Sequence, residues 1–118
     1  MTQAYKRGRA GLSLLDPGFW RALCDPTRVA ILGWLMAQRS PRSVSEIAQS
    51  GCCRVDLSVV SRHLATLRDA GVVEGERRGK ELLYRVRNAA LVGTLRQLAD
   101  SIEACCPVSK HEPKGRTR

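Results

Sequence analysis

The chain has 118 residues, of which 43% are hydrophobic, and this suits one domain with a modest core. No apolar run approaches the roughly 20 residues that span a bilayer, and the N-terminal segment lacks the apolar stretch of a secretory signal. We therefore expect a cytoplasmic protein with no membrane partner. The formal net charge of +9 favours a polyanionic partner. Five cysteines, an odd number, argue against a disulfide framework, so we interpret them as thiols.

The two ends of the chain differ from its middle. Residues 1–13 and 107–118 are basic and rich in Gly, Pro or Ser, with few periodic apolar positions. Such composition is typical of flexible tails. We expect one compact domain, residues 14–106, between them.

Two Asp-Pro pairs open the predicted domain, at Asp16 and Asp25. Each pair combines a capping carboxylate with a proline suited to the first helical turn, so each predicts the start of a helix. The second helix carries an apolar stripe at helical spacing, which we expect to be buried. The stripe consists of Val29, Leu32, Leu35 and Met36, widened by Ile31 and Trp34.

Two further helices follow, separated by a turn. The letters "SVSE" at 43–46 form a capping box, which predicts a helix as far as about Gln49. Gly51 ends that helix, Asp56 caps the next one, and Gly71 ends it after about Ala70. The pattern predicts two helices joined by a tight turn.

The helix after the turn has two contrasting faces. Val60, Leu64 and Leu67, with Leu57 beside them, define the face expected to pack inward. The outward face carries small hydroxyls and a guanidinium in its first half, and it consists of Ser58, Arg62, Ala65, Thr66 and Asp69, with Ser61 at the flank. Short side chains allow close approach to a major groove, and Arg can bind guanine with two hydrogen bonds. A solvated amphipathic helix is the alternative.

Further predicted DNA contacts flank this face. His63 lies nearer the inward edge, so we expect a boundary or phosphate-contacting residue rather than a base reader or a metal ligand. Short apolar segments around "ERRGKE", with Gly79 in the turn, predict a β-hairpin placed as a wing. The full set of predicted DNA-binding residues is Ser58, Ser61, Arg62, His63, Thr66, Arg54, Arg77, Arg78 and Lys80.

Four segments together resemble a known family. In order and spacing, "ALCDPTRVAIL", "SVSEIA", "DLSVVSRHLATLRDAGVV" and "RRGKELLYRV" are similar to the ArsR family of bacterial metal- and metalloid-responsive repressors, over about residues 17–104. The resemblance implies a mainly α winged helix-turn-helix with a small β-hairpin. It also implies a homodimer that binds double-stranded operator DNA and leaves it when an inducer binds. Ser58, Ser61 and Arg62 match the family's recognition-helix positions.

The last predicted helix begins at about Asn88. Its apolar stripe suits a dimer seam better than solvent, and the family's terminal helices form that seam. Packing onto its own domain is the alternative. The stripe consists of Leu91, Leu95, Leu98 and Ile102.

Two pairs of adjacent cysteines are the candidate sensor. Cys52 and Cys53 occupy the turn that aims the predicted recognition helix. Thiolates select As(III), Hg, Cd, Cu(I) or Zn, and two adjacent cysteines seldom complete a coordination shell. We therefore expect Cys105 and Cys106, from the same or the other subunit, to supply further ligands. The expected inducer is As(III) or another soft metal ion, with no organic cofactor.

The sequence also departs from the family pattern. The common arsenic site has two cysteines, separated by one residue, in the helix before the turn, and "SVSEIAQS" has none. The family's zinc site uses Asp and His pairs on the last helix, which here lacks His. Cys24 replaces what is usually a small apolar residue, so we expect it to be buried.

Other functions were weighed against this one. No cysteine has Arg six residues after it, and no Cys-x-x-Cys, P-loop or zinc-hydrolase motif occurs, so catalysis is not expected. Buried cysteines without ligands, a redox- or persulfide-sensing repressor, and a constitutive DNA-binding protein with a structural zinc remain open.

Overall fold

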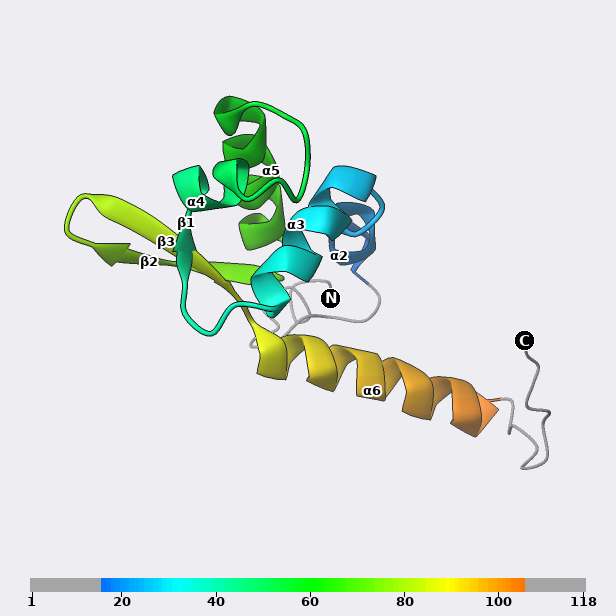
Figure 1. Cartoon of the computed structure of the whole chain (residues 1–118). Helices are drawn as coiled ribbons and strands as arrows, with labels where there is room; N and C mark the ends of the chain where they lie inside the picture. Colours follow the sequence, from blue (N-terminus) through cyan, green and yellow to red (C-terminus); the bar gives the residue numbers. More distant parts are fainter. Residues whose placement is uncertain (1–15, 106–118) are drawn as a thin grey trace.

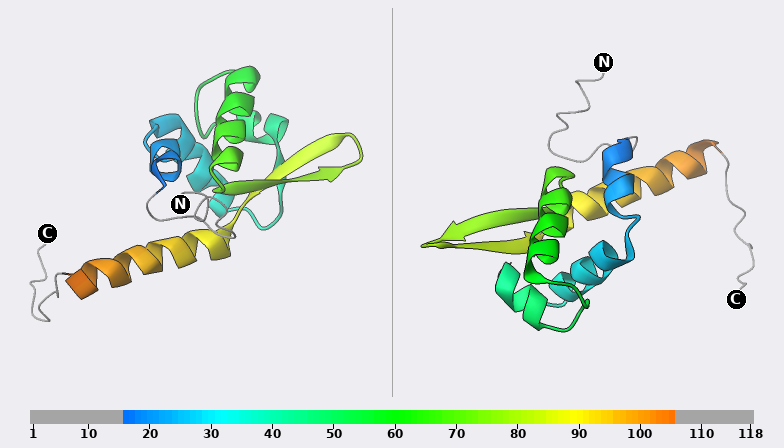
Figure 2. Two further views of the ribbon diagram at one scale, coloured as in Figure 1. Left: turned by 180° about the vertical axis from the view of Figure 1, so that it is seen from behind. Right: turned by 90° about the horizontal axis from the view of Figure 1, so that it is seen from above.

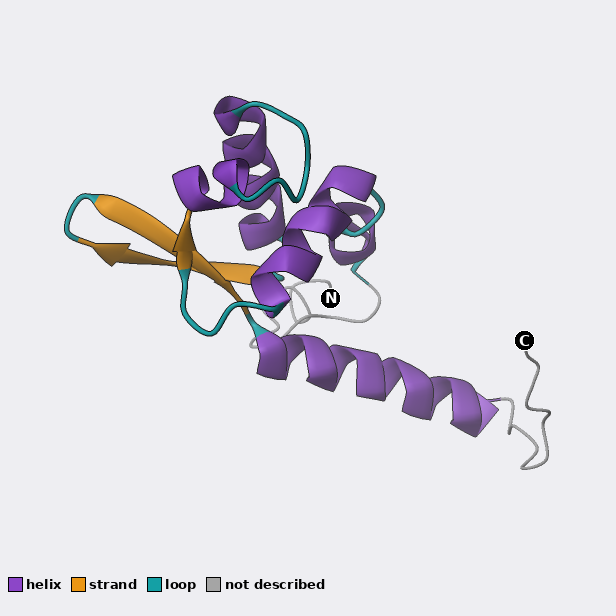
Figure 3. Ribbon diagram, viewed as in Figure 1, coloured by secondary structure: helices purple, strands orange, loops and turns teal. Residues whose placement is uncertain are grey.

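The computed structural model describes residues 16–105, which form five helices and a small sheet that lies against one side of the helical core (Figures 1 and 3). The elements are α2 (Pro17–Ala22), α3 (Pro26–Met36), β1 (Arg42–Ser43), α4 (Val44–Gln49), α5 (Leu57–Asp69), β2 (Val73–Arg78), β3 (Glu81–Val86) and α6 (Asn88–Cys105). This order is a winged helix-turn-helix, which confirms the predicted fold class. The predicted tails and Cys106 lie outside the described residues.

Local capping starts most of the helices where the sequence predicts. The Asp16 carboxylate accepts a hydrogen bond from the Gly18 amide at 3.0 Å, and the Asp25 carboxylate accepts one from Thr27 at 2.8 Å. Asp56 is the N-cap of α5, but its side chain makes no capping hydrogen bond, so that part of the prediction is wrong. Its backbone carbonyl instead accepts bonds from the first turn of α5, while its carboxylate stays exposed to water.

The core lies where α3, α4 and α5 meet the sheet. The fully buried residues include Ile31, Ile47, Leu64 and Leu67. On α5 the predicted inward face is confirmed at Val60, Leu64 and Leu67, which have no exposed surface. Leu57, predicted to join them, is 50% exposed because the first turn of α5 projects beyond the core.

The predicted inward face of α3 is displaced. Val29 and Met36 are 50% and 57% exposed, whereas Ile31, Leu32 and Leu35 are buried. The side of α3 that packs against β3 and α5 is therefore centred on Ile31 and Leu35. The stripe chosen from the sequence was wrong at its two ends.

Three antiparallel strands form the sheet in the order β1-β3-β2. Val73 pairs with Val86 and Arg78 pairs with Glu81, which leaves a two-residue turn. Gly79 occupies its first position with φ of 63°, a conformation that favours glycine. The two-residue strand β1 was not predicted. The hairpin of β2 and β3 projects away from the helices (Figures 1 and 2).

Helix α6 leaves the end of β3 and runs in the opposite direction to the hairpin (Figure 2). Only Leu91 and Thr94 on α6 are buried, so most of the helix stands away from its own domain. Leu95 and Ile102 are about half exposed, at 49% and 52%. Within residues 16–105, no helix is long and apolar enough to cross a membrane.

Candidate DNA-binding and thiol site

The outer face of α5 carries the predicted groove-contacting side chains. Of the residues that the sequence placed outward, Ser58, Arg62, Thr66 and Asp69 are exposed, as is Ser61 at the flank, whereas Ala65 is half-buried. Thr66 donates its hydroxyl to the Arg62 carbonyl at 3.2 Å, whereas no ion pair within residues 16–105 engages the Arg62 guanidinium. Since Val60 and Leu64 anchor the opposite face in the core, these polar groups are held outward on a rigid helix.

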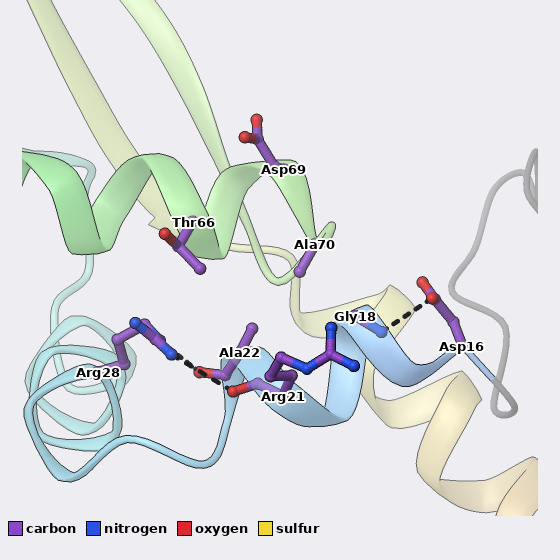
Figure 4. A pocket seen from close by; sticks show the side chains of 8 residues that line it. All are labelled: Asp16, Gly18, Arg21, Ala22, Arg28, Thr66, Asp69 and Ala70. Atoms are coloured by element: carbon purple, nitrogen blue, oxygen red, sulfur yellow. Dashed lines mark hydrogen bonds between the residues drawn. The ribbon is translucent and has the colours of Figure 1, made fainter.

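His63 lies at the boundary that its helical position predicts. It is half-buried, and its Nδ1 lies 3.1 Å from Nη1 of Arg28. Arg28 also donates from Nε to the Ala22 carbonyl at 2.7 Å and from Nη2 to the Arg21 carbonyl at 3.4 Å (Figure 4). Sequence reasoning did not single out Arg28. The one available signal is its place in the first turn of α3, three residues after the capping Asp25.

An open pocket of about 450 Å³ lies beside this contact, between α2, the start of α3 and the second half of α5 (Figure 4). Its walls carry charges of both signs, so they present no single-sign surface to a ligand. The lining residues are Asp16, Gly18, Arg21, Ala22, Arg28, Thr66, Asp69 and Ala70.

The three cations at the tip of the wing differ in whether a carboxylate pairs with them. Arg78 is paired with Glu76, with Nη2 and Oε2 only 2.8 Å apart. Arg77 and Lys80 are exposed and form no ion pair within the described residues. Arg54, in the turn before α5, is also exposed. Arg77 and Lys80 are therefore the free positive charges of the wing, while Arg78 is partly neutralised.

The cysteine pair in the α4–α5 turn is held at the edge of the core. Cys52 and Cys53 are both half-buried against it, and their Sγ atoms lie 3.6 Å apart. Cys52 Sγ also lies 3.9 Å from the Ile47 carbonyl. Burial, and after it the neighbouring Cys52 thiol, raises the pKa of Cys53 to about 11. Both sulfurs belong to the segment that leads directly into α5.

The other cysteines lie elsewhere. Cys105 is exposed at the last residue of α6, and all views place that end of α6 away from the α4–α5 turn (Figures 1 and 2). Within residues 16–105 no group of three His, Cys, Asp or Glu side chains could hold a metal ion. The chain therefore brings Cys52 and Cys53 together but does not bring Cys105 to them.

Cys24 is exposed, which corrects the prediction of burial. It lies in the corner between α2 and α3, where its amide donates to the Arg21 carbonyl at 3.1 Å. That backbone bond closes the corner with the side chain directed to the surface.

Comparisons with known proteins agree with this architecture. A family model described as a helix-turn-helix domain matches residues 23–76. The chain is 46% identical over 66 residues to the HTH-type transcriptional repressor SmtB of Mycobacterium tuberculosis, covering 56% of this chain and 46% of that protein. It thus spans about half the length of the SmtB proteins that it matches. It is 40% identical over 95 residues to a probable mercury resistance operon repressor of Streptomyces lividans, covering 75% of this chain and 72% of the relative.

Solved structures give the same class of protein. An ArsR family transcriptional regulator superposes with a TM-score of 0.61 at 30% identity, covering 75% of this chain and 92% of that one. A homodimeric winged helix-turn-helix domain from Mycobacterium bovis has a TM-score of 0.55 at 25% identity, covering 83% and 85%. The fold is thus that of winged helix-turn-helix DNA-binding domains. The chain belongs to the ArsR family of transcriptional regulators, and these relatives are regulators rather than enzymes.

Proposed function

We propose that this chain is a DNA-binding transcriptional repressor that acts as a homodimer and releases its operator when a soft, thiophilic inducer binds cysteine thiolates. As(III) is the first candidate inducer. The observation that carries the proposal is the pair Cys52 and Cys53 in the turn directly before the exposed polar face of α5. The names of the relatives support it, since SmtB is a repressor and the Streptomyces relative is assigned to mercury, another soft metal.

DNA binding follows from three features of the surface. The outer face of α5 offers hydroxyls and the Arg62 guanidinium to a major groove. The wing offers Arg77 and Lys80 to phosphates, and the net charge of +9 attracts the duplex. In a homodimer, two α5 helices would enter successive major grooves roughly 34 Å apart. A regulator of this kind acts on chromosomal DNA, so we also propose a cytoplasmic location. We further propose that residues 14–106 form a single domain.

The cysteine pair fits part of a metal or metalloid site. Two thiolates bound to one tetrahedral ion at about 2.3 Å lie about 3.8 Å apart. The Sγ atoms of Cys52 and Cys53 are 3.6 Å apart, so both could bind one centre with little movement. A pyramidal As(III) centre takes about three thiolates, and the described part of one chain offers two sulfurs here.

The missing ligand is proposed to come across the dimer. Positions 91, 95, 98, 102 and 105 follow one another at steps of three or four along α6, so Cys105 continues the apolar stripe. If that stripe is the dimer seam, Cys105 lies on the seam and Cys106 follows it. Cys105 and Cys106 of the second copy in the dimer are therefore the proposed remaining ligands.

Ligand binding would act on α5 through the turn. Cys52 and Cys53 pack against the core, and a thiolate bound to a soft ion cannot keep the same position or the same protonation state. The displaced residues lie within five positions of the start of α5. Movement of the turn would re-aim the helix, and its aim decides whether both helices of a dimer fit the operator.

The first experiment identifies the DNA and then the inducer. Duplexes that bind the wild-type protein are selected from a random-sequence library, and release is followed by fluorescence anisotropy with As(III), antimonite, Hg(II), Cd(II), Zn(II) and a persulfide donor. We expect release with As(III). Cys52→Ser/Cys53→Ser should bind the duplex normally and not release it, whereas the matched control Cys24→Ser should behave as wild type. Normal release by the double variant would contradict the sensor, and failure to select any duplex would contradict DNA binding.

Two truncations test the terminal pair. A chain ending at Ala104 lacks both terminal cysteines, and a chain ending at Cys106 retains them and removes only the tail. We expect the first to bind DNA without releasing it and the second to release it normally. Because the Cys53 thiol, with its pKa raised to about 11, must lose its proton, inducer affinity should also rise with pH across the neutral range. If both truncated chains release DNA alike, the sensor is confined to Cys52, Cys53 and any ligand near them.

A further inference from the structure

Arg28 connects three helices through one guanidinium group. It lies on α3, donates to the Ala22 carbonyl at the end of α2, and lies 3.1 Å from Nδ1 of His63 on α5. A guanidinium has donors and no acceptor, and it keeps its proton at any physiological pH. The contact therefore requires an unprotonated Nδ1, which leaves His63 neutral with its proton on Nε2.

We propose that Arg28 is a positioning residue for α5: it holds His63 in this single neutral form, so that the aim of the recognition helix depends on the protonation of His63. This proposal rests on the proposed function in one respect, namely that α5 reads DNA. The Arg28–His63 bond itself does not depend on it.

The contact is suited to positioning because it joins distant parts of the chain. Arg28 and His63 are 35 residues apart, and the same guanidinium bonds the carbonyls of Ala22 and Arg21. Helix ends leave carbonyl groups without partners in the helix, and Arg28 supplies a donor to the Ala22 carbonyl, while the Arg21 carbonyl also accepts from the Cys24 amide. One side chain thus joins the end of α2, through the bonds drawn in Figure 4, to His63 in the middle of α5.

A second partner for Arg28 is close by. An oxygen of the Asp25 carboxylate lies 4.0 Å from Nη1 of Arg28. The backbone bond from the Arg28 amide, and after it the bond from Thr27 and the charge of Arg28, hold the pKa of Asp25 below its ordinary value. The Asp25 carboxylate therefore stays ionised in the pH range in which histidines take up a proton.

The remaining charged groups are on the walls of the adjoining pocket. Within the described residues these are Asp16, which caps α2, Arg21, on α2, and Asp69, about one turn and a half after His63 on α5 (Figure 4). None of these three groups forms a hydrogen bond or ion pair with His63 that would replace the one from Arg28.

Protonation of His63 removes the acceptor and places two cations next to each other. The guanidinium would then leave His63 for Asp25, and α5 would lose its polar link to α2 and α3. Added positive charge near DNA by itself strengthens binding. The proposed link predicts the opposite sign, namely weaker binding as the pH falls, and this difference makes the proposal testable.

The first test observes the imidazole directly in the protein without DNA. Long-range ¹H–¹⁵N correlation spectra at pH 7.5 should show Nδ1 unprotonated and Nε2 protonated for His63. Arg28→Met, which has a side chain of similar reach and no donor, should show a mixture of the two neutral forms. The only other histidine in the sequence, His111, is identified by His111→Gln. A protonated Nδ1 in the wild type would overturn the proposal.

The second test measures affinity for the selected duplex between pH 7.5 and 5.5 at constant ionic strength. We expect the wild type to lose about fivefold or more in affinity. His63→Asn places an amide oxygen near the position of Nδ1 and does not titrate, so its affinity, whatever its value at pH 7.5, should not fall between pH 7.5 and 5.5. His111→Gln should keep the wild-type profile. A rise in affinity with acid, or an unchanged profile in His63→Asn, would overturn the proposal.

Thermal unfolding without DNA separates the two hypotheses. As the pH is lowered, the midpoint temperature of unfolding should fall further for the wild type than for His63→Asn. This expectation does not depend on whether the protein binds DNA. If no duplex is selected but this difference appears, DNA binding fails and the Arg28–His63 link holds. If duplexes bind and the difference is missing, the link fails alone.

Discussion

Arg62 and Lys80 are both exposed cations, but they lie on elements that would meet different parts of a duplex. Arg62 projects from the middle of α5, and Lys80 occupies the turn of the wing. A guanidinium in the major groove can hold guanine with two hydrogen bonds, whereas an ammonium on a flexible lysine side chain meets phosphates as a point charge. Arg62→Ala should therefore cost about 1–3 kcal/mol on the selected duplex and relax its sequence preference.

The matched substitution on the wing should behave differently. Lys80→Ala should weaken binding to all duplexes by a similar factor and lower the salt slope by about one. Both effects are measured by anisotropy on the selected and on a scrambled duplex over a range of salt concentrations. Arg39→Ala removes one exposed charge from the α3–β1 loop and serves as the control for net charge. Identical behaviour of the Arg62 and Lys80 variants would contradict this division of roles.

At the scale of elements, the capping box at the start of α4 is the best-defined local interaction. The Ser43 hydroxyl accepts from the Glu46 amide at 3.1 Å, and the Glu46 carboxylate accepts from the Ser43 amide at 2.9 Å. Ser43→Ala should lower the free energy of unfolding by about 1 kcal/mol, as loss of an N-cap does, in urea titrations. Ser45→Ala, an exposed serine on the same helix, is the control and should change it little. Equal losses in the two variants would show that the cap is not what stabilises α4.

The starts of the elements were predictable because caps and turn glycines act within a few residues. Asp16, Asp25, Gly51 and Gly79 each begin or end an element where the sequence indicated. Which face of α3 is buried was harder, because both faces carry apolar residues and only the position of β3 and α5 selects Ile31 over Val29. Strand β1 has two residues, too short to show an alternating pattern.

As with the fold, the parts of the site that depend on local sequence patterns were predictable, and those that depend on contacts between distant residues were not. The outer face of α5 follows from helical periodicity alone, so the exposure of Ser58 and Arg62 could be expected from the sequence. The contact between Arg28 and His63 joins residues 35 positions apart, and no local pattern indicates it. The exposure of Cys24 depends on how the corner between α2 and α3 closes, which the family pattern did not reveal.

At the scale of the whole molecule, the hairpin and α6 project in opposite directions from the helical core (Figure 2). The hairpin is basic at its tip, whereas α6 exposes apolar side chains along its length. One end of the molecule therefore suits phosphates and the other suits a second protein surface. The homodimeric neighbour from Mycobacterium bovis is consistent with the second copy of this chain as that surface.

The dimer is tested on α6 with a pair of substitutions that add the same charge to opposite faces. Leu95 lies on the exposed apolar stripe, and Gln97 is exposed about 200° away around the helix. Leu95→Lys should place an ammonium in the seam, so the protein should sediment as a monomer at micromolar concentration. Tight binding to a duplex with two-fold symmetry should also be lost, because a monomer has one α5 and contacts only one half-site. Gln97→Lys should remain dimeric and bind as wild type. If the wild type and Leu95→Lys both sediment as dimers, the dimer seam lies elsewhere. If the wild type itself is monomeric and still binds DNA tightly, the arrangement of two α5 helices in successive grooves is wrong. Cys105 would then have no dimer interface through which to reach a second subunit.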